Sequence, residues 1–278
     1  MKNFTKLVNF EFNRFLKLYV TLLIIVYGIQ TAGVLFHTFK FKKLTNDIVM
    51  RGEMTELEFT EMYGVFSMED FTMSSLYILP IYVGIAAIAF YAFFIWYRDW
   101  FAKHTFIYRL LTLPTQRMNI YLAKLTTMLL ITLGYAALQI VMIAFHSKLT
   151  KWIIPQAFRY DYSLYESVNL TSQYSLVLTG NAFDFFIAYA FILTAIIVIF
   201  TAVLFERSYR WKGLVIGIVY AFIIFLLIVV PFTVMFLFYY QPRIYPEEAL
   251  FIQLGIMLII VVTSLFISRH LMNKKVSV

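Results

Sequence analysis

Apolar residues occur in six long runs along the chain, separated by more polar segments. Each run has at least 20 mainly apolar residues, which is the length that an α-helix needs to cross the hydrocarbon core of a bilayer. The runs predict six transmembrane helices, over 18–39, 75–97, 120–146, 182–205, 214–240 and 249–268. Because proline removes a backbone donor, we expect a kink or a broken turn at Pro80 and at Pro231.

The first 17 residues have the pattern of an amphipathic helix. Phe4, Val8, Phe12 and Phe15 fall on one helical stripe, and lysine and asparagine side chains lie largely on the opposite side. Such a helix lies in the membrane interface rather than across the bilayer. The pattern predicts an elbow helix over 1–17 that leads into the first span. Docking of this helix to a cytoplasmic partner is a second interpretation.

The composition agrees with a membrane protein. Hydrophobic residues make up 62% of the 278 residues and charged residues only 14%, whereas soluble domains carry about 25% charged residues. We therefore predict an all-α, polytopic membrane protein with one domain over 1–278. The chain has no cysteine, which excludes disulfides, thiolate metal sites and cysteine nucleophiles.

Basic residues indicate the orientation in the membrane. With an inner N-terminus, the inner segments and span ends hold 15 of the 23 basic residues and only three acids, while the outer segments hold 8 basic residues and 12 acids. Lys and Arg near span ends favour the cytoplasmic side, so we expect both termini to be cytoplasmic. The net charge of +8 lies in short clusters beside apolar runs, a distribution that does not predict a nucleic-acid partner.

Two long outer loops follow from this topology, over 40–74 and 147–181. The first has seven acids against four basic residues, and its stretch EMTELEFTEMYGVF predicts an amphipathic outer helix. The second is rich in Tyr and Phe. One interpretation is an acidic, aromatic surface that receives cationic amphipathic peptides or a substrate leaving the membrane. The other is a pair of solvated loops that cap the spans.

The predicted spans lack the charged residues and sequence motifs that are typical of catalytic, metal-binding or nucleotide-binding sites. None has a charged residue near its middle, and the four histidines are scattered near span ends. There is no HExxH and no GxxxxGK[ST] motif. We therefore expect no catalytic, metal-binding or cofactor-binding residues, and no enzyme activity of the chain itself. The stretch GLVIG, Gly213 to Gly217, matches the small-residue spacing of helix contacts.

A proline-broken segment lies between the second and third predicted spans, with the sequence YRLLTLPTQRMNIYLAK over 108–124. Pro114 should end a short helical piece, because proline cannot continue the backbone hydrogen bonding. Thr115 is the predicted N-cap of a helix that restarts and runs into the third span. The pattern thus predicts a short helix at an angle to the membrane.

The stretch LLTLPTQRMNIYLAKLTTMLL resembles the segment between the second and third spans of permease subunits of type-2 ATP-binding-cassette exporters. A Leu-Pro-x-x-Arg turn followed by a lysine is common there, and the elbow helix, six spans and missing ATP motif fit the same plan. The resemblance implies a coupling helix that contacts a separate ATPase subunit. It implies a main contact and a smaller one, made by Tyr108, Arg109, Leu113, Pro114, Thr115, Gln116 and Arg117, and by Arg207, Arg210 and Lys212.

The same resemblance implies a function. The chain would be the membrane subunit of an exporter in the bacterial plasma membrane. It would pair with a second permease protomer, identical or related, and with two ATPase subunits that bind the ATP. Amphipathic or antimicrobial peptides are the first expected substrates, followed by lipids or hydrophobic drugs. A membrane-embedded lipid-modifying enzyme, a non-transporting sensor, and a segment 98–119 that serves only as a basic inner loop are the alternatives.

Overall fold

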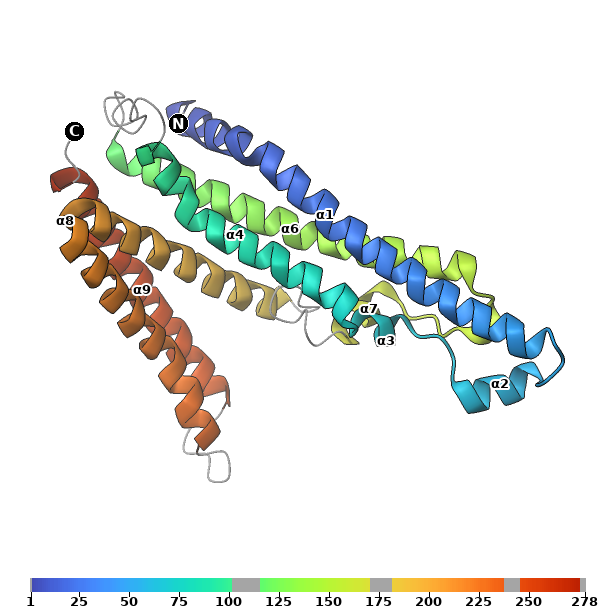
Figure 1. Cartoon of the computed structure of the whole chain (residues 1–278). Helices are drawn as coiled ribbons and strands as arrows, with labels where there is room; N and C mark the ends of the chain where they lie inside the picture. The colour runs from blue at the N-terminus through green and yellow to red at the C-terminus, as the bar shows by residue number, and fades with distance from the viewer. Residues whose placement is uncertain (1, 102–115, 171–181, 238–245, 276–278) are drawn as a thin grey trace. The chain divides into compact units, whose positions relative to one another are not determined.

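The computed structural model describes residues 2–101, 116–170, 182–237 and 246–275. Within these ranges the chain is helical, and its one β-type pairing is an isolated bridge between Phe66 and Arg159. Figure 1 shows five long helices, which are α1 (Lys2–Val49), α4 (Ser75–Phe101), α6 (Arg117–Ile153), α8 (Ala182–Leu237) and α9 (Pro246–Lys274). The short elements are α2 (Glu56–Tyr63), α3 (Met68–Thr72), the 3-10 helix η1 (Gln156–Phe158) and α7 (Leu164–Leu170).

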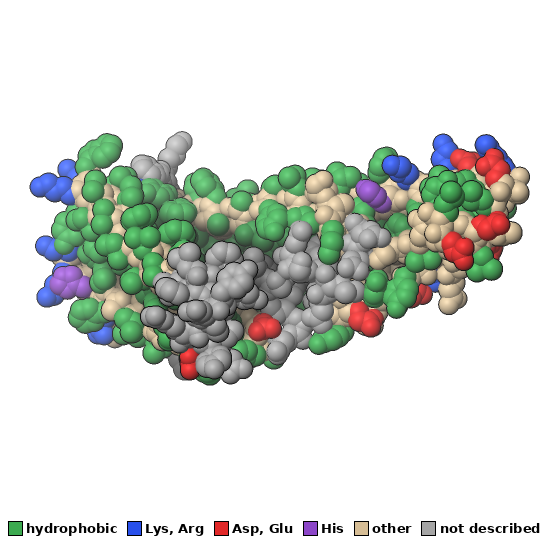
Figure 2. Space-filling model, turned by 90° about the horizontal axis from the view of Figure 1, so that it is seen from below, with side chains coloured by type: hydrophobic (Ala, Val, Ile, Leu, Met, Phe, Trp, Pro, Cys, Tyr) green, Lys and Arg blue, Asp and Glu red, His purple; other side chains and the backbone are tan. Residues whose placement is uncertain are grey.

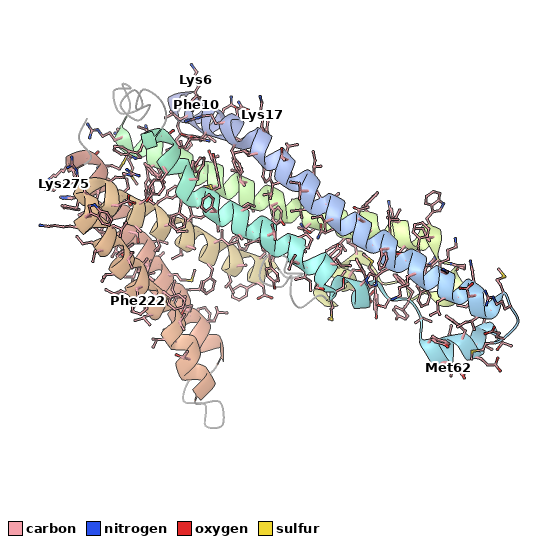
Figure 3. All side chains as sticks on the ribbon, viewed as in Figure 1. Lys6, Phe10, Lys17, Met62, Phe222 and Lys275 are labelled. Atoms are coloured by element: carbon pink, nitrogen blue, oxygen red, sulfur yellow. The ribbon has the colours of Figure 1, made fainter. Side chains whose placement is uncertain are left out.

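All five long helices are long and apolar enough to cross a membrane. Large apolar side chains remain exposed along them, for example Ile24, Leu258 and Phe266, at 67%, 67% and 73% exposure. Figure 3 shows such side chains projecting outward along the helices. An apolar outer surface is stable in lipid but not in water, so the chain is a multi-pass, all-α membrane protein, as the sequence predicts.

Helix α8 contains both the fourth and the fifth predicted spans and folds back at Arg210 (φ 53°, ψ −130°). A Cβ atom on Gly213 would lie 1.9 Å from the carbonyl oxygen of Phe205, and one on Gly217 would lie 2.9 Å from that of Ala202. The two arms of α8 therefore pack backbone against backbone, and the helix contact predicted at GLVIG is confirmed. The described residues form five long helices, one of them bent, and six separate crossings stay a prediction.

The predicted elbow helix is not a separate element. Residues 2–17 form the first turns of α1, which continues without a break to Val49 over 48 residues. The segment 2–27 contains neither glycine nor proline, so nothing in it favours interruption of the helix. At 1.5 Å per residue α1 is about 72 Å long, well beyond the roughly 30 Å hydrocarbon core of a bilayer.

The two prolines inside long helices do not break them. α4 continues through Pro80 and α8 continues through Pro231, and the only non-helical residue within α8 is Arg210. In lipid, water does not compete for backbone groups, so a helix can keep the rest of its hydrogen bonds around a single missing donor. No broken turn forms at either proline, and a kink at these two positions stays a prediction.

The chain divides into two compact units. Unit 1 comprises Met1–Arg14, Ile88–Leu130 and Phe186–Val278, and unit 2 comprises Phe15–Ala87 and Ile131–Phe185. The core of unit 1 is aromatic, since Trp96, Tyr121 and Phe200 are buried with ring centroids 5.5–6.1 Å apart. Such edge-to-face contacts stabilise a core beyond simple burial.

In unit 2, tyrosine hydroxyls bond across helices at glycines. Tyr19 on α1 donates to the carbonyl oxygen of Ile131 on α6 at 3.2 Å, and Tyr135 on α6 donates to that of Ile81 on α4 at 3.1 Å. Gly84 makes room for the second contact, because a Cβ atom there would lie 2.1 Å from the Tyr135 hydroxyl. These bonds join α1, α4 and α6 of unit 2 without any charge.

Amide, hydroxyl and imidazole groups make a second set of buried hydrogen bonds in unit 2. Gln30 Nε2 donates to Gln139 Oε1 at 3.3 Å and to the carbonyl oxygen of Tyr77 at 3.4 Å. His146 is fully buried, with Nε2 3.0 Å from the Thr31 hydroxyl and Nδ1 3.2 Å from the Tyr77 hydroxyl. The sequence placed His146 at the end of a span. It lies well inside α6, which ends only at Ile153.

The two predicted outer loops are shorter than expected, because α1 extends to Val49 and α6 to Ile153. Residues 50–74 and 154–170 fold together into a small structure, here called the cap. Phe66 pairs with the other segment, since its N–H donates to Phe158 at 2.8 Å and its carbonyl accepts from Tyr160 at 3.0 Å. Phe59, Ile154 and Phe158 form its buried core. The helix predicted in the first loop is confirmed as α2, and its outer position stays a prediction.

Candidate functional site

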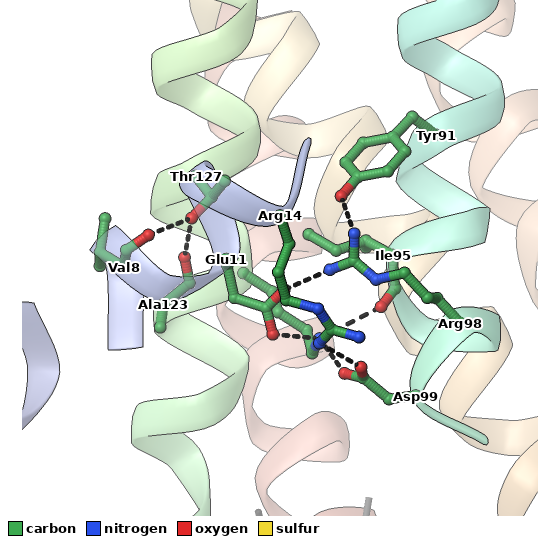
Figure 4. A network of polar contacts seen from close by, with 10 residues as sticks. Val8, Glu11, Arg14, Tyr91, Ile95, Arg98, Asp99, Ala123 and Thr127 are labelled. Atoms are coloured by element: carbon green, nitrogen blue, oxygen red, sulfur yellow. Dashed lines mark hydrogen bonds and ion pairs between the residues drawn. The ribbon is translucent and has the colours of Figure 1, made fainter. Parts of the chain in front are cut away.

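Five charged side chains gather in unit 1, as Figure 4 shows for four of them by label. Glu11 and Arg14 come from α1, Arg98 and Asp99 from the end of α4, and Lys124 from the start of α6. They form a continuous set of ion pairs. We call these five residues the ion-pair network.

Lys124 is the centre of the network. Its side chain is fully buried, and Nζ donates to Glu11 Oε1 at 2.7 Å and to the carbonyl oxygen of Ile95 at 3.1 Å. A third contact reaches Asp99 Oδ2. An ammonium group has three donors, so every donor of Lys124 has an acceptor. Trp96 adds a ring face 5.4 Å from Nζ.

Two arginines complete the network from its more exposed side. Arg14 Nη1 donates to Asp99 Oδ1 at 2.7 Å, and Arg98 Nη2 donates to Glu11 Oε2 at 2.7 Å. Arg98 Nη1 also donates to the Tyr91 hydroxyl at 2.8 Å. The arginine side chains are 24% and 15% exposed, whereas the two carboxylates are 0% and 3% exposed. Each buried carboxylate therefore accepts bonds from two cations, which offsets its desolvation.

The local sequence explains why these residues meet. Glu11 and Arg14 are three residues apart and share one face of α1. Arg98 and Asp99 occupy the last turns of α4, and Lys124 lies two turns into α6. The network therefore joins α4 and α6, which flank residues 102–115, to each other and to the start of α1.

The main predicted coupling contact is only partly described. Tyr108, Arg109, Leu113, Pro114 and Thr115 lie outside the described residues. The remaining two are placed at the restart of the helix: Gln116 is exposed and precedes α6, which begins at Arg117. The predicted N-cap, Thr115, lies outside the described residues. Arg117 is half-buried, and its Nη1 donates to the carbonyl oxygen of Met272 in the last turn of α9 at 3.0 Å. Arg117 thus bonds the end of another helix.

The residues of the smaller predicted contact differ in burial: Arg207 is half-buried, whereas Arg210 and Lys212 are exposed. Arg207 is turned into unit 1, with its guanidinium 4.6 Å from the Tyr97 ring and 5.6 Å from the Trp100 ring. Its side chain is only 17% exposed and lies 3.7 Å from Glu206. Arg207 therefore packs within the unit, as a guanidinium over aromatic faces commonly does.

Arg210 and Lys212, by contrast, are exposed at the turn between the arms of α8, beside Trp211, which is 83% exposed. Arg210 has φ 53°, a left-handed backbone conformation that favours glycine. A non-glycine residue held in such a conformation costs of order 1–3 kcal/mol and is concentrated at functional sites. The turn thus presents two cations and an indole on a strained backbone.

Sequence reasoning missed the network. The charge count assigned the five side chains to the inner side of the membrane and predicted no ion pairs between them. One signal was available, because Glu11 lies within the apolar stripe of the N-terminal helix, between Val8 and Phe15. A carboxylate at such a position is costly unless it is paired. Among the residues that the structure describes, no group of three His, Asp or Glu side chains is placed to hold a metal ion.

Comparison with protein-family models, with characterised proteins and with solved structures gave no match to this chain. The findings identify a multi-helix membrane protein with five candidate spans.

Proposed function

We propose that this chain is the membrane-spanning permease subunit of an ATP-driven exporter in a bacterial plasma membrane. Separate ATPase subunits, two per complex, would bind the ATP, and a second permease protomer would complete the pathway. The observation that carries the proposal is the ion-pair network. It joins the helices on both sides of the inner connection 102–115, the segment that resembles a coupling element of such exporters.

The network supplies a physical route for the coupling. ATP binding draws two ATPase subunits together, and a segment docked on them moves with them. Glu11 and Asp99 each bond cations from two other parts of the chain. A displacement of the connection would therefore move α4 and α6 together, along with the start of α1. Buried charge pairs resist separation strongly, because splitting one leaves an uncompensated buried charge.

The turn of α8 offers a second contact. Arg210, Trp211 and Lys212 are exposed there, and aromatic and arginine side chains are enriched at protein interfaces. In the proposed complex these residues contact the ATPase subunit, while Arg207 supports the turn from within unit 1. Peptides of amphipathic character are the proposed substrates, with lipids or hydrophobic drugs as the second class.

The test is purification of the tagged chain in mild detergent together with a candidate P-loop ATPase from the same cell. A photo-crosslinking residue at Gln116 or at Lys212 should form an adduct with the ATPase subunit, and the same residue at the exposed Trp152 of α6 should not. If neither inner position forms an adduct and the eluate hydrolyses no ATP, the proposal fails.

A variant of Arg210 tests the backbone strain at this residue separately from its proposed contact with the ATPase subunit. Glycine relieves the left-handed conformation, so Arg210→Gly should raise the thermal stability of the chain. The same change removes a cation from the proposed interface and should lower the affinity for the ATPase subunit. Arg269→Gln, an exposed cation of α9, is the matched control for charge. Unchanged affinity in Arg210→Gly would remove this turn from the interface.

A further inference from the structure

A group of three buried polar atoms in unit 2 has no hydrogen-bond partner in the described part of the chain. They are the amide oxygen of Gln30, the amide nitrogen of Gln139 and the hydroxyl of Tyr27. Gln30 lies on α1 and Gln139 on α6, at 0% and 1% exposure. Buried polar atoms are hydrogen-bonded in the large majority of cases, to protein or to ordered water. These three atoms therefore need a partner that the described residues do not supply.

The surroundings of the helices do not supply that partner either. Figure 2 shows hydrophobic side chains over much of the visible surface. In a membrane such a surface contacts hydrocarbon, which neither donates nor accepts hydrogen bonds. An amide atom left unpaired in that environment is costly. The partner must therefore lie inside unit 2.

The two amides cannot satisfy each other by turning over. Gln30 Nε2 donates to the carbonyl oxygen of Tyr77 at 3.4 Å and to Gln139 Oε1 at 3.3 Å. With the Gln30 amide reversed, its oxygen would face the Tyr77 carbonyl oxygen. With the Gln139 amide reversed, two amide nitrogens would face each other. The hydrogen bonds thus determine both orientations, and they leave one open acceptor on Gln30 and one open donor on Gln139.

The three open atoms lie in one region between α1 and α6. The two amides share a hydrogen bond, so their open ends are close to each other. Tyr27 is three residues before Gln30 on the same face of α1, and Tyr135 is four residues before Gln139 on the same face of α6. The Tyr27 hydroxyl interacts electrostatically with that of Tyr135. It is therefore directed toward α6 beside the amide pair.

The chemistry of these groups selects a small neutral ligand. They offer one acceptor, one donor and a hydroxyl that acts as either. Among the described residues, no charged side chain bonds to the two amides, and an ion without a countercharge is costly inside a membrane. At 0% and 1% exposure, the amides leave no entry for a larger organic molecule. Water has two donors and two acceptors, and a buried water typically makes about three hydrogen bonds.

We propose that unit 2 binds one internal water molecule between α1 and α6. The water accepts from Gln139 Nε2, donates to Gln30 Oε1 and bonds to the Tyr27 hydroxyl. Together with the bond from Gln30 to Tyr77 on α4, it joins three helices. The contact between α1 and α6 then depends on a ligand that exchanges with solvent, as ordered waters do. The site does not depend on the proposed export function, so it is tested on the chain alone.

The experiment uses the full chain, labelled with NMR-active nitrogen, in bilayers of zwitterionic lipid. Solid-state NMR measures magnetisation transfer from water protons to the side-chain amide nitrogens, and the Gln139 signal is assigned by its loss in Gln139→Leu. Tyr27→Phe removes one partner of the water and keeps the ring. Tyr82→Phe, which removes an exposed hydroxyl of α4 in the same unit, is the matched control. The backbone amide spectrum checks that each variant is folded.

The expected result is transfer to Gln139 Nε2 in the unaltered chain and in Tyr82→Phe, with weaker transfer in Tyr27→Phe. Loss of one hydrogen bond should lower the affinity of the site for water about fivefold. Absence of transfer to Gln139 in the folded, unaltered chain would mean that the two amides are dry and would overturn the proposal. Equal transfer in Tyr27→Phe and Tyr82→Phe would also overturn it, because the water would then not bond to Tyr27.

A second readout separates one bound water from general water penetration. The backbone N–H of Ile29 is next to Gln30 within the continuous helix α1, and its side chain is exposed on the apolar surface. Transfer to this backbone nitrogen should stay at the level of the lipid-facing helix residues. Transfer equal to that at Gln139 would indicate a water-filled path along α1 and would overturn the single-water site.

Discussion

Ion pairs are buried in unit 1 but lie at the surface in unit 2. In unit 1 the network buries two carboxylates and a lysine almost completely, with Lys124 and Asp99 at 0% exposure. In unit 2 every ion pair among the described residues lies at the surface, as in the pairs of Asp161 with Arg159 and Lys151. The interior of unit 2 is joined instead by amide, hydroxyl and imidazole groups.

The difference follows from what each part of the bundle tolerates. A charge near the bilayer centre costs at least about 2.5–3.5 kcal/mol, whereas interhelical hydrogen bonds between neutral groups carry no such penalty. Glu11, Asp99 and Lys124 all lie within a few turns of a helix end. In unit 1, buried ion pairs join α1, α4 and α6 next to residues 102–115, whereas the helices of unit 2 are joined by neutral amide and hydroxyl groups.

The largest loss of stability is expected from Lys124→Met. The variant leaves the buried Glu11 and Asp99 carboxylates with one arginine each, and removing one partner of a buried pair costs roughly 3–5 kcal/mol in free energy of unfolding. Unfolding by SDS in mixed micelles measures it, with the exposed Lys6→Met as control. Equal stability of the two variants would mean that the network is not buried as described.

Gly84→Ala probes the tightest neutral contact of unit 2. Its Cβ atom would lie 2.1 Å from the Tyr135 hydroxyl, so the ring must move and lose its bond to Ile81, at a cost of about 1–3 kcal/mol. Gly28→Ala is the control, because nothing lies within 4 Å of a Cβ there. If both substitutions are neutral in the same unfolding assay, the close packing of α4 on α6 is wrong.

A smaller effect is expected from Gln139→Leu, which removes the acceptor of Gln30. Interhelical hydrogen bonds in membranes contribute about 0.6 kcal/mol on average and about 1.7 at most. The loss should therefore be well below that of Lys124→Met. A loss of stability as large as that of Lys124→Met would contradict the expected difference between the neutral bonds of unit 2 and the ion pairs of unit 1.

The smallest effect concerns surface charge in the cap. The Arg159 guanidinium holds the pKa of the Asp161 carboxyl below its ordinary value. A lowered folded-state pKa stabilises the fold above the unfolded pKa of about 3.9, and this contribution is lost as the pH falls through the folded value. Hydrogen exchange should show the backbone pairing of Phe66 loosening below about pH 4 before α4 and α6 respond. Arg159→Gln should weaken that acid step.

Much of the fold was predictable from the sequence, because apolar runs of spanning length and glycine spacing act locally. The helix after Pro114, the helix α2 and the contact at Gly213 and Gly217 follow from proline, amphipathic and small-residue patterns. Continuity of α1 through residue 17 was not predicted, since amphipathic patterning suggested a boundary where no helix breaker exists.

The site was less predictable, because it depends on contacts between distant segments. Lys124 and Asp99 are 25 residues apart, and Glu11 and Lys124 are 113 apart. Periodicity cannot pair such residues. The resemblance implies that Arg117 and Arg207 contact an ATPase subunit, which stays a prediction. Within unit 1, Arg117 bonds α9 and Arg207 packs on aromatic rings, and the sequence pattern did not indicate these contacts.

The central claim is that the ion-pair network carries movement from the inner connection to the spans. The most direct test is the ratio of ATP turnover in the assembled complex to that of the isolated ATPase subunit, for Arg14→Gln and for the exposed control Lys17→Gln. The account predicts that both variants assemble fully and that only Arg14→Gln loses stimulation, because Asp99 then keeps a single partner. Full stimulation in Arg14→Gln at equal assembly would contradict it.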